Sequence, residues 1–298
     1  MTAEPDDFAE ATGRVGVAGV TGLLGAELAA EVRRRGGVPV PLARPAWDFA
    51  RPDGFPALPA GLRAVVNAAA YTRVDEAEAE EELATTVNGR AVGALARRCG
   101  DAGVRLVHVS TDYVFDGRRD TPYPVDHPLN PRSAYGRSKA AGEAALAASG
   151  AASLCVRTGW LHGPGGRCFV RTIRDALPRR PKLHVVADQR GRPTGAASLA
   201  RLLLDLLGAG ARGTFHGTDG GEATWFGVAR AVAGRYGRGA DVLPAETREF
   251  ARPARRPAYS VLDLAATEAL LGPRPPWTVA LADTLDRLDA AGPPPAAR

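Results

Sequence analysis

A short apolar segment that runs directly into three glycines constrains the fold of this chain more than any other feature. Residues 14–18 read as a buried strand, Gly19, Gly22 and Gly25 follow, and residues 26–35 have the pattern of an amphipathic helix. A strand, a glycine turn and a helix in this order suit a dinucleotide, because bare backbone and a helix N-terminus can face its pyrophosphate. The alternative is a glycine turn that only lets the helix pack against the strand. Because these glycines follow the first predicted strand, we favour the dinucleotide-binding interpretation.

Strands and helices alternate along much of the remaining chain. Apolar runs predict strands, and amphipathic segments between them predict helices; the predicted strands are 38–42, 64–70, 104–109, 153–157, 184–186 and 213–216, and the predicted helices are 75–98, 134–148, 169–176, 197–207 and 225–234. This alternation predicts an α/β fold with a Rossmann-like doubly wound parallel sheet. The pattern loosens after about residue 177, which predicts a smaller C-terminal substrate-binding lobe. The predicted divisions are a Rossmann domain over 14–177, to which later segments return, a lobe mainly over 178–290, and disordered ends at 1–13 and 291–298.

The composition narrows the class of protein. With 298 residues, 45% hydrophobic and 24% charged, the chain reads as an ordinary globular protein. No apolar run approaches the ~18 residues of a membrane span, and the acidic first residues lack a signal sequence, so we expect a cytoplasmic protein. The three cysteines and five histidines lack metal-ligand spacing, so no metal site is predicted from them. The net charge of +5 is spread among acids without a basic stripe, so no nucleic-acid partner is predicted.

The pair Tyr135 and Lys139 is the strongest candidate for chemistry. Among 38 Lys and Arg residues only Lys139 and Lys182 are lysines, so this lysine indicates a position where a guanidinium does not serve. An ammonium one helical turn from a phenol would lower the tyrosine pKa from near ~10 and allow proton transfer near neutral pH. A surface helix that carries the two residues by chance is the alternative, because Tyr-x-x-x-Lys alone is common.

Two further positions follow predicted strands, where parallel sheets bind ligands. Ser110 and Thr111 stand at the carboxyl end of the strand predicted at 104–109. Arg44 follows the strand predicted at 38–42, where an NAD-selective site would carry an acid. Since an arginine can take a 2′-phosphate, this position favours NADPH, with NADH as the second choice. A solvated loop arginine is the alternative.

Several motifs in order resemble the extended short-chain dehydrogenase/reductase superfamily and, within it, the dTDP-4-dehydrorhamnose reductase family. The resemblance runs from about Arg14 to Leu288. The segments that carry it are Asn67-Ala68-Ala69-Ala70-Tyr71-Thr72, Val74-Asp75, Ser110-Thr111-Asp112-Tyr113-Val114-Phe115-Asp116-Gly117, Tyr135-Gly136-Arg137-Ser138-Lys139 with Gly142-Glu143, Arg157-Thr158-Gly159-Trp160, Asp188-Gln189-Arg190-Gly191-Arg192-Pro193-Thr194 and Arg256-Pro257.

The resemblance implies NAD(P)H-dependent reduction of the C4 keto group of a dTDP-4-keto-6-deoxyhexose in deoxysugar biosynthesis. It implies that Tyr135 protonates the carbonyl oxygen, that Lys139 lowers the tyrosine pKa and holds the nicotinamide ribose, and that Thr111 donates a hydrogen bond to the same oxygen. The implied cofactor-binding residues are Gly19, Val20, Thr21, Gly22, Leu23, Leu24, Arg44, Ala68, Ala69, Ala70, Tyr71, Ser110, Tyr135 and Lys139. The implied substrate-binding residues are Asp112, Trp160, Arg190, Pro193, Thr194 and Arg256. A turn role for Asp112 and a lobe-core role for Trp160 remain alternatives.

The chain also departs from the family pattern. Some members hold Mg²⁺ at a dimer interface between two glutamates; Glu27 matches the first, but Ala197 and Ser198 occupy the second position. We therefore predict no Mg²⁺ and expect a monomer or weak homodimer. Gly159 replaces the family's usual serine and Pro124 replaces an acid, so the hexose need not be the rhamnose precursor.

Four other functions compete with this one. A related 4-ketoreductase of a secondary-metabolite (antibiotic) pathway would act on a different hexose. A nucleotide-sugar 4,6-dehydratase would want a glutamate where Tyr113 stands, and a 4-epimerase would keep its NAD tightly bound. A noncatalytic NADP-binding regulatory subunit would have no need of the intact set Thr111, Tyr135 and Lys139.

Overall fold

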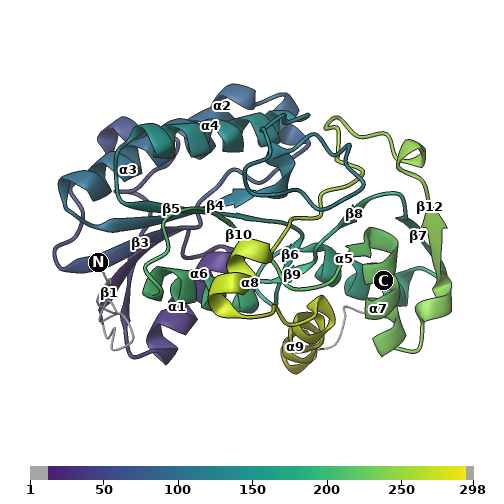
Figure 1. Ribbon diagram of the computed structural model, residues 1–298. Coiled ribbons are helices and arrows are strands. Elements are labelled where there is room, and N and C mark those ends of the chain that lie inside the picture. The colour runs from purple at the N-terminus through teal and green to yellow at the C-terminus, as the bar shows by residue number, and fades with distance from the viewer. Residues whose placement is uncertain (1–12, 293–298) are drawn as a thin grey trace.

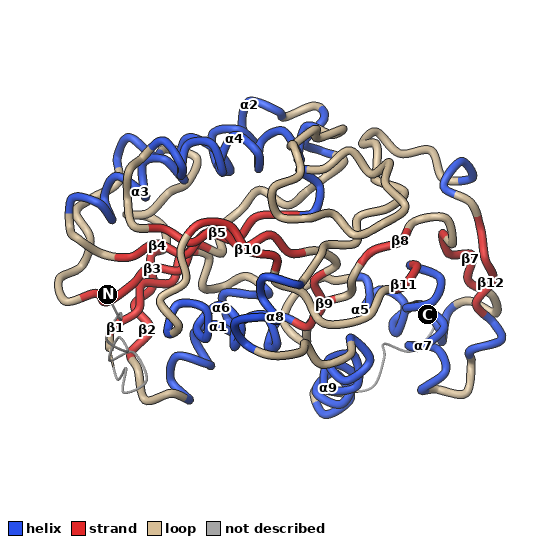
Figure 2. The backbone as a smooth tube through the Cα atoms, in the orientation of Figure 1, coloured by secondary structure: helices blue, strands red, loops and turns tan. Residues whose placement is uncertain are grey.

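The computed structural model describes residues 13–292 and places a six-stranded parallel sheet at the centre of the molecule (Figures 1 and 2). The strand order is β10-β5-β4-β3-β1-β2, with the bounds β1 (Arg14–Ala18), β2 (Val38–Leu42), β3 (Leu62–Asn67), β4 (Arg105–Thr111), β5 (Ser153–Thr158) and β10 (Gly213–His216). The order reverses between β1 and β3, which is the switch point where doubly wound sheets bind ligands. The predicted fold class is confirmed. The ends predicted to be disordered lie outside the described residues, except for residues 13, 291 and 292.

Helices cover both faces of this sheet (Figure 1). The helices α1 (Leu23–Arg34) and α6 (Ala196–Gly208) lie on one face, and α2 (Glu81–Thr85), α3 (Ala91–Asp101) and α4 (Ala134–Ala148) lie on the other. Because side chains alternate along a strand, Val66 packs toward α6 whereas its neighbour Val65 packs toward α3. Strands buried on both faces read as continuous apolar runs, as these do.

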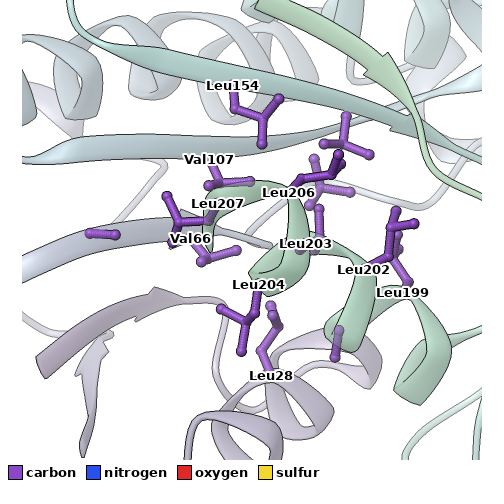
Figure 3. Packing of buried hydrophobic residues seen from close by; sticks show 14 of the residues in the cluster. Leu28, Val66, Val107, Leu154, Leu199, Leu202, Leu203, Leu204, Leu206 and Leu207 are labelled. Atoms are coloured by element: carbon purple, nitrogen blue, oxygen red, sulfur yellow. The ribbon is translucent and has the colours of Figure 1, made fainter. Parts of the chain in front are cut away.

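The helix α6 closes the larger core (Figure 3). Its buried leucines recur at helical spacing and meet valines and leucines of the sheet and of α1; the core includes Leu28, Val66, Val107, Leu154, Leu199, Leu202, Leu203, Leu206 and Leu207. Each fully buried leucine contributes about 1.5–3 kcal/mol relative to an exposed one. This packing holds the carboxyl ends of the strands, and therefore the site, in a fixed arrangement.

A second core forms the lobe. It is built from β7 (Leu183–Val186), β12 (Val242–Ala245), α5 (Phe169–Ala176), α7 (Trp225–Arg235) and α9 (Trp277–Ala290). Short strands join the lobe to the sheet domain: β6 (Leu161–His162) pairs with β9 (Thr194–Gly195), and β8 (Arg190–Gly191) pairs with β11 (Ala223–Thr224), while α8 (Ala265–Leu271) contacts β10. By its packing α5 joins the lobe, although the predicted boundary at 177 and 178 places it in the Rossmann domain. The helix α6 and strand β10 return to the sheet domain.

The helix predicted over 75–98 is interrupted. The segment begins with a 3₁₀ turn at Glu76–Glu78 and contains a π-helical turn at Thr86–Arg90 between α2 and α3. Asn88 in this turn is fully buried, and its side chain bonds to both the N–H and the carbonyl of Tyr71, at 2.8 and 3.0 Å. The extra residue of a π-turn re-aims this side chain toward the loop that follows β3. None of the helices in residues 13–292 is long and apolar enough to cross a lipid bilayer.

Candidate functional site

The glycine turn lies at the switch point between β1 and β3. Gly19 has φ of +75°, and a Cβ on it would sit 2.7 Å from the backbone nitrogen of Ala69. Only glycine combines that φ with so close an approach of two chain segments. Gly22, which directly precedes α1, donates its N–H to the Gly19 carbonyl at 2.9 Å. The exposed backbone at Thr21 and Gly22 and the N-terminus of α1 fit the pyrophosphate of a dinucleotide.

The other predicted cofactor residues near this turn differ in their exposure to solvent. Val20 and Leu23 are partly exposed, whereas Leu24 is buried in the core and offers only backbone. Ala68, Ala69 and Ala70 are partly exposed and follow β3 directly, and Arg44 is exposed just after β2.

Tyr71 is fixed beside them rather than open to a ligand. It is 8% exposed, and its hydroxyl donates to Glu80 Oε2 at 2.6 Å. Together with the bonds from Asn88, this contact makes the segment after β3 a rigid wall next to the glycine turn.

The structure brings two of the predicted catalytic hydroxyls together. Thr111 ends β4, and Tyr135 lies in the first turn of α4, where the Ser133 hydroxyl caps the helix by accepting from Gly136 N at 3.1 Å. A hydrogen bond between the Thr111 and Tyr135 side chains acts to lower the pKa of Tyr135. The end of a strand and the start of a helix therefore meet at the carboxyl edge of the sheet.

Burial dominates the acidity of Tyr135. Removal from water raises the pKa of its phenol, the Thr111 hydrogen bond lowers it and the Asp112 carboxylate raises it, with the result that the pKa of Tyr135 rises to about 12. The lowered pKa that the sequence predicted is therefore wrong for this structure. The reason is the position of Lys139, whose ammonium donates to the Val109 carbonyl at 2.7 Å and lies 3.3 Å from His108 Nε2, so it is held by β4.

Lys139 itself is 2% exposed, and burial lowers its pKa to about 8. His108 beside it is fully buried, and both burial and the lysine charge lower its pKa well below the ordinary value, so the imidazole is neutral. Its Nδ1 lies 3.1 Å from Asn67 Nδ2. A costly buried ammonium that is fixed at the edge of a ligand-binding sheet is typical of a functional position.

Asp112 lies behind Thr111. Its Oδ1 accepts from the Thr111 hydroxyl at 3.0 Å, its Oδ2 is buried without a hydrogen-bond partner, and burial raises its pKa to about 6. The side chain is 2% exposed, and the predicted contact of Asp112 with a sugar stays a prediction beside its alternative role in the loop. A Cβ on Gly159 would sit 2.8 Å from Asp112 Oδ2, so the glycine makes room for the carboxylate.

The predicted substrate residues near β8 divide into exposed and buried ones. Arg190 is exposed and pairs with Glu222 at 2.8 Å, so its guanidinium lies at the surface. Pro193 is buried, and Thr194 is fully buried with its hydroxyl bonded to the Arg192 carbonyl at 3.2 Å. Thr194 therefore stabilises the loop and its side chain cannot reach a ligand here.

Arg256 is committed to a carboxylate from the other half of the molecule. Its two terminal nitrogens donate to Asp75 at 2.9 and 2.7 Å, and Ala254 N donates to the same carboxylate at 3.2 Å. The Arg256 hydrogen bond lowers the pKa of Asp75 to about 2. This pair ties the segment after β12 to the loop after β3, and the pyrophosphate contact of Arg256 stays a prediction.

Trp160 stands where the chain leaves β5 for the lobe. Its φ is +51°, which makes it the one non-glycine residue with positive φ among those described. Such a conformation costs about 1–3 kcal/mol and persists only where surrounding contacts hold it. The indole stacks on Trp225 with ring centroids 3.6 Å apart and planes 3° from parallel, as the lobe-core alternative expects for one face of the ring.

Several residues of the site were not singled out from the sequence. Asn88 supports the wall after β3, and Glu143 of α4 accepts from Ser110 at 2.5 Å and from Arg157 at 2.7 Å. Ser110 thereby bonds to a buried ion pair, and its contact with the cofactor stays a prediction. The dipeptide Gly142-Glu143 in the matching motif and the arginine at the end of β5 were the available signals.

A divalent cation does not fit the position that the family implies. Both Glu27 oxygens accept from Arg287, at 2.8 and 3.1 Å, and Ala197 and Ser198 supply no second carboxylate. Residues 13–292 contain no group of three or more acidic, histidine or cysteine side chains that could hold a metal. A cavity of about 220 Å³ next to this pair is lined mainly by residues of α6 and α9 and by none of the predicted catalytic residues.

Comparisons with known proteins agree with these motifs. The family model described as RmlD substrate binding domain matches residues 13–290. The "Probable dTDP-4,6-dihydroxy-2-methyloxan-3-one 4-ketoreductase" of Streptomyces antibioticus is 40% identical over 95% of this chain and 98% of its own. The dTDP-4-dehydrorhamnose reductase of Burkholderia thailandensis is 39% identical over 89% and 95% of the two chains.

A solved structure shows the same fold over nearly its whole length. The dTDP-4-dehydrorhamnose reductase of Bacillus anthracis, crystallised in complex with NADP, superposes with a TM-score of 0.85 at 31% identity and covers 92% of this chain and 99% of its own. The family model, the two relatives and this structure agree, and the chain therefore belongs to the dTDP-4-dehydrorhamnose reductase family of the extended short-chain dehydrogenase/reductase superfamily.

Proposed function

We propose that this protein is an NADPH-dependent nucleotide-sugar 4-ketoreductase, which reduces the C4 keto group of a dTDP-4-keto-6-deoxyhexose in deoxysugar biosynthesis. The observation that carries the proposal is the contact between the Thr111 and Tyr135 hydroxyls at the carboxyl edge of the sheet that also holds the glycine turn. The exposed Arg44 after β2 supports NADPH over NADH, because its guanidinium can pair with a 2′-phosphate.

Three residues would take part in the reduction of the C4 keto group. When bound, a nicotinamide would supply the hydride for the C4 carbon. Tyr135 donates its proton to the carbonyl oxygen, and because burial raises its pKa to about 12, the phenol keeps that proton at neutral pH until the oxygen becomes basic. Thr111 holds the phenol by their mutual hydrogen bond, and Lys139 fixes the α4 turn to β4 where the nicotinamide ribose would lie.

The test is to mix the protein with NADPH and a dTDP-4-keto-6-deoxyhexose and to follow the nicotinamide absorbance. Tyr135→Phe should lower kcat by about 10²–10⁴-fold, the usual contribution of general acid catalysis. Tyr236→Phe is the matched control, because its hydroxyl also bonds to a neighbour, Asp289 at 2.8 Å, but lies in the lobe. Full activity of Tyr135→Phe would contradict the mechanism. Binding of NADPH without oxidation across several keto-sugars would favour the regulatory subunit instead.

A related 4-ketoreductase of an antibiotic pathway, which acts on another hexose, is the second candidate. It is favoured by Gly159, which leaves Asp112 Oδ2 without the hydroxyl that a serine would offer, and by the 40% identity to the Streptomyces antibioticus ketoreductase. Comparing kcat/KM for hexoses that differ at C2 and C3 separates the two candidates. We further propose a cytoplasmic enzyme that is a monomer or weak homodimer and needs no Mg²⁺.

A further inference from the structure

Trp160 and Trp225 form a stacked pair at the junction of the sheet domain and the lobe. Trp160 follows β5 and Trp225 is the first residue of α7, and the ring centroids lie 3.6 Å apart with planes 3° from parallel. Phe169 of α5 packs on the same Trp225 ring at 4.6 Å with a tilt of 59°. The stack therefore covers one face of the Trp160 indole with a partner that is itself supported from the lobe core.

Trp225 is anchored by hydrogen bonds as well as by packing. Its indole N–H donates to Gln189 Oε1 at 3.1 Å, and Gln189 Nε2 in turn donates to Thr247 Oγ1 at 2.9 Å. Gln189 is 4% exposed, so this amide is committed to the pair of contacts. The Thr224 hydroxyl caps α7 by accepting from Gly227 N at 3.0 Å, which fixes the backbone at Trp225.

Trp160, unlike Trp225, has an unfavourable backbone conformation and no hydrogen bond from its indole N–H to any described residue. Its backbone occupies the left-handed region at φ +51°, and its carbonyl accepts from Thr194 N at 3.2 Å. A Cβ on Gly191 would sit 2.5 Å from its indole nitrogen, so the ring lies directly on the β8 backbone. The indole remains partly exposed, and its N–H has no acceptor among the described residues. A strained backbone with a free donor is typical of a residue that serves a ligand.

The residue just before Trp160 adjoins the carboxylate that contacts Thr111. Gly159, the residue before Trp160, abuts the Asp112 carboxylate, which accepts from the Thr111 hydroxyl at 3.0 Å. The backbone of Trp160, one residue after Gly159, therefore begins beside the carboxylate that accepts from Thr111. Because Trp225 covers one indole face and the Gly191 backbone lies against the ring near its nitrogen, only the part of the Trp160 indole that these two leave exposed can meet a ligand.

We propose that Trp225 is a positioning residue, which fixes the orientation in which the Trp160 indole meets the hexose of the nucleotide sugar. The proposal rests on the 4-ketoreductase function given above and deepens it. An aromatic ring held flat by a second ring and by glycine backbone loses little conformational freedom when a sugar packs on it, so the stack would contribute to sugar affinity rather than to hydride transfer.

The experiment compares Trp225→Leu with Trp277→Leu. Trp277 is a matched control, since it is also the first residue of a lobe helix and packs in the same core but does not stack on Trp160. Two stacked indoles produce an exciton couplet in circular dichroism. We expect Trp225→Leu to lose the couplet and to raise KM for the keto-sugar about tenfold, with kcat and KM for NADPH within about twofold of the wild type. Trp160→Leu should lose the same couplet, and Trp277→Leu should keep it.

Two results would overturn the proposal. One is loss of the couplet in Trp225→Leu with an unchanged sugar KM. The other is an equal rise of both KM values together with the same loss of thermal stability as in Trp277→Leu, which would show a purely structural role. If the wild type does not oxidise NADPH, the 4-ketoreductase function fails, whereas the role of the stack is still tested by calorimetric titration of a dTDP-6-deoxyhexose into the wild type, Trp225→Leu and Trp277→Leu. A dissociation constant that stays unchanged in Trp225→Leu would overturn the proposal.

Discussion

Replacing Lys139 by methionine should abolish activity while leaving the fold at least as stable at neutral pH. Burial lowers the lysine pKa from its ordinary 10.5 to about 8. At 1.36 kcal/mol per unit, the buried charge destabilises the folded state by about 3 kcal/mol. Methionine has a similar length and no charge, but it gives up the 2.7 Å hydrogen bond to Val109, which contributes about 1.5–3 kcal/mol. The two effects nearly cancel, and the variant should match the wild type or exceed it by about 1 kcal/mol.

The dependence on pH separates the two effects. Because the folded-state pKa of Lys139 lies below its unfolded value, the unfolded chain binds the proton more tightly, and the penalty is fully present below about pH 8 and disappears above about pH 10.5. Urea unfolding curves at about pH 7 and pH 10 should therefore show the variant losing roughly 2 kcal/mol relative to the wild type.

The control for this experiment is the other lysine of the chain. Lys182 is exposed, and Lys182→Met should change stability by less than about 0.5 kcal/mol at both pH values. A stability difference between Lys139→Met and the wild type that stays constant from pH 7 to pH 10 would refute the view that Lys139 is held as a costly buried ammonium.

Three further changes test other parts of the structure. Gly19→Ala should weaken NADPH binding at least about tenfold in a fluorescence titration, because the new Cβ would meet the backbone after β3 at 2.7 Å; an unchanged Kd would count against the glycine turn as the dinucleotide site. Asp75→Asn should lower the free energy of unfolding by about 2 kcal/mol in urea at pH 7. Because the pKa of Asp75 is lowered to about 2, this stabilisation is present above about pH 4 and is lost as the pH falls toward 2. The free energies of unfolding of the variant and the wild type should therefore converge near pH 2. Excess EDTA should leave turnover unchanged, since Arg287 already occupies Glu27, and activity that is lost and then restored by Mg²⁺ would contradict this assignment.

Much of the fold follows from local patterns. The helices at 134–148 and 169–176 and the strands at 38–42 and 213–216 lie where the sequence predicts them, because apolar periodicity and caps such as Ser133 act within a few residues. The helix predicted to begin at residue 26 begins at Leu23, since the turn of glycines leads directly into its first turn. The interruption around Asn88 could not be predicted, because it depends on hydrogen bonds to Tyr71 in another segment.

Some features of the candidate site can likewise be predicted from local sequence, and others cannot. The type and order of residues around Thr111 and Tyr135 suffice to predict that these hydroxyls meet at the edge of the sheet. The commitment of Arg256 to Asp75 is invisible in sequence, since the partners are 181 positions apart and an exposed arginine has the same local pattern. The acidity of Tyr135 was mispredicted because the one-turn spacing to Lys139 does not reveal that the ammonium is directed at β4, nor that loss of hydration at the phenol outweighs its other contacts.

The way the chain threads between its two halves limits how such enzymes can change their substrate. It leaves the sheet after β5, returns with α6 and β10, enters the lobe again through α7 and β12, and comes back past β10 with α8 before α9 closes the lobe core (Figure 1). No single break in the chain separates the sheet domain from the lobe, so the lobe cannot be exchanged between relatives as one continuous segment. Between the two halves, Gly159 and Gly191 leave room for the Asp112 carboxylate and the Trp160 indole, so a side chain at either position would change how closely these groups approach the chain.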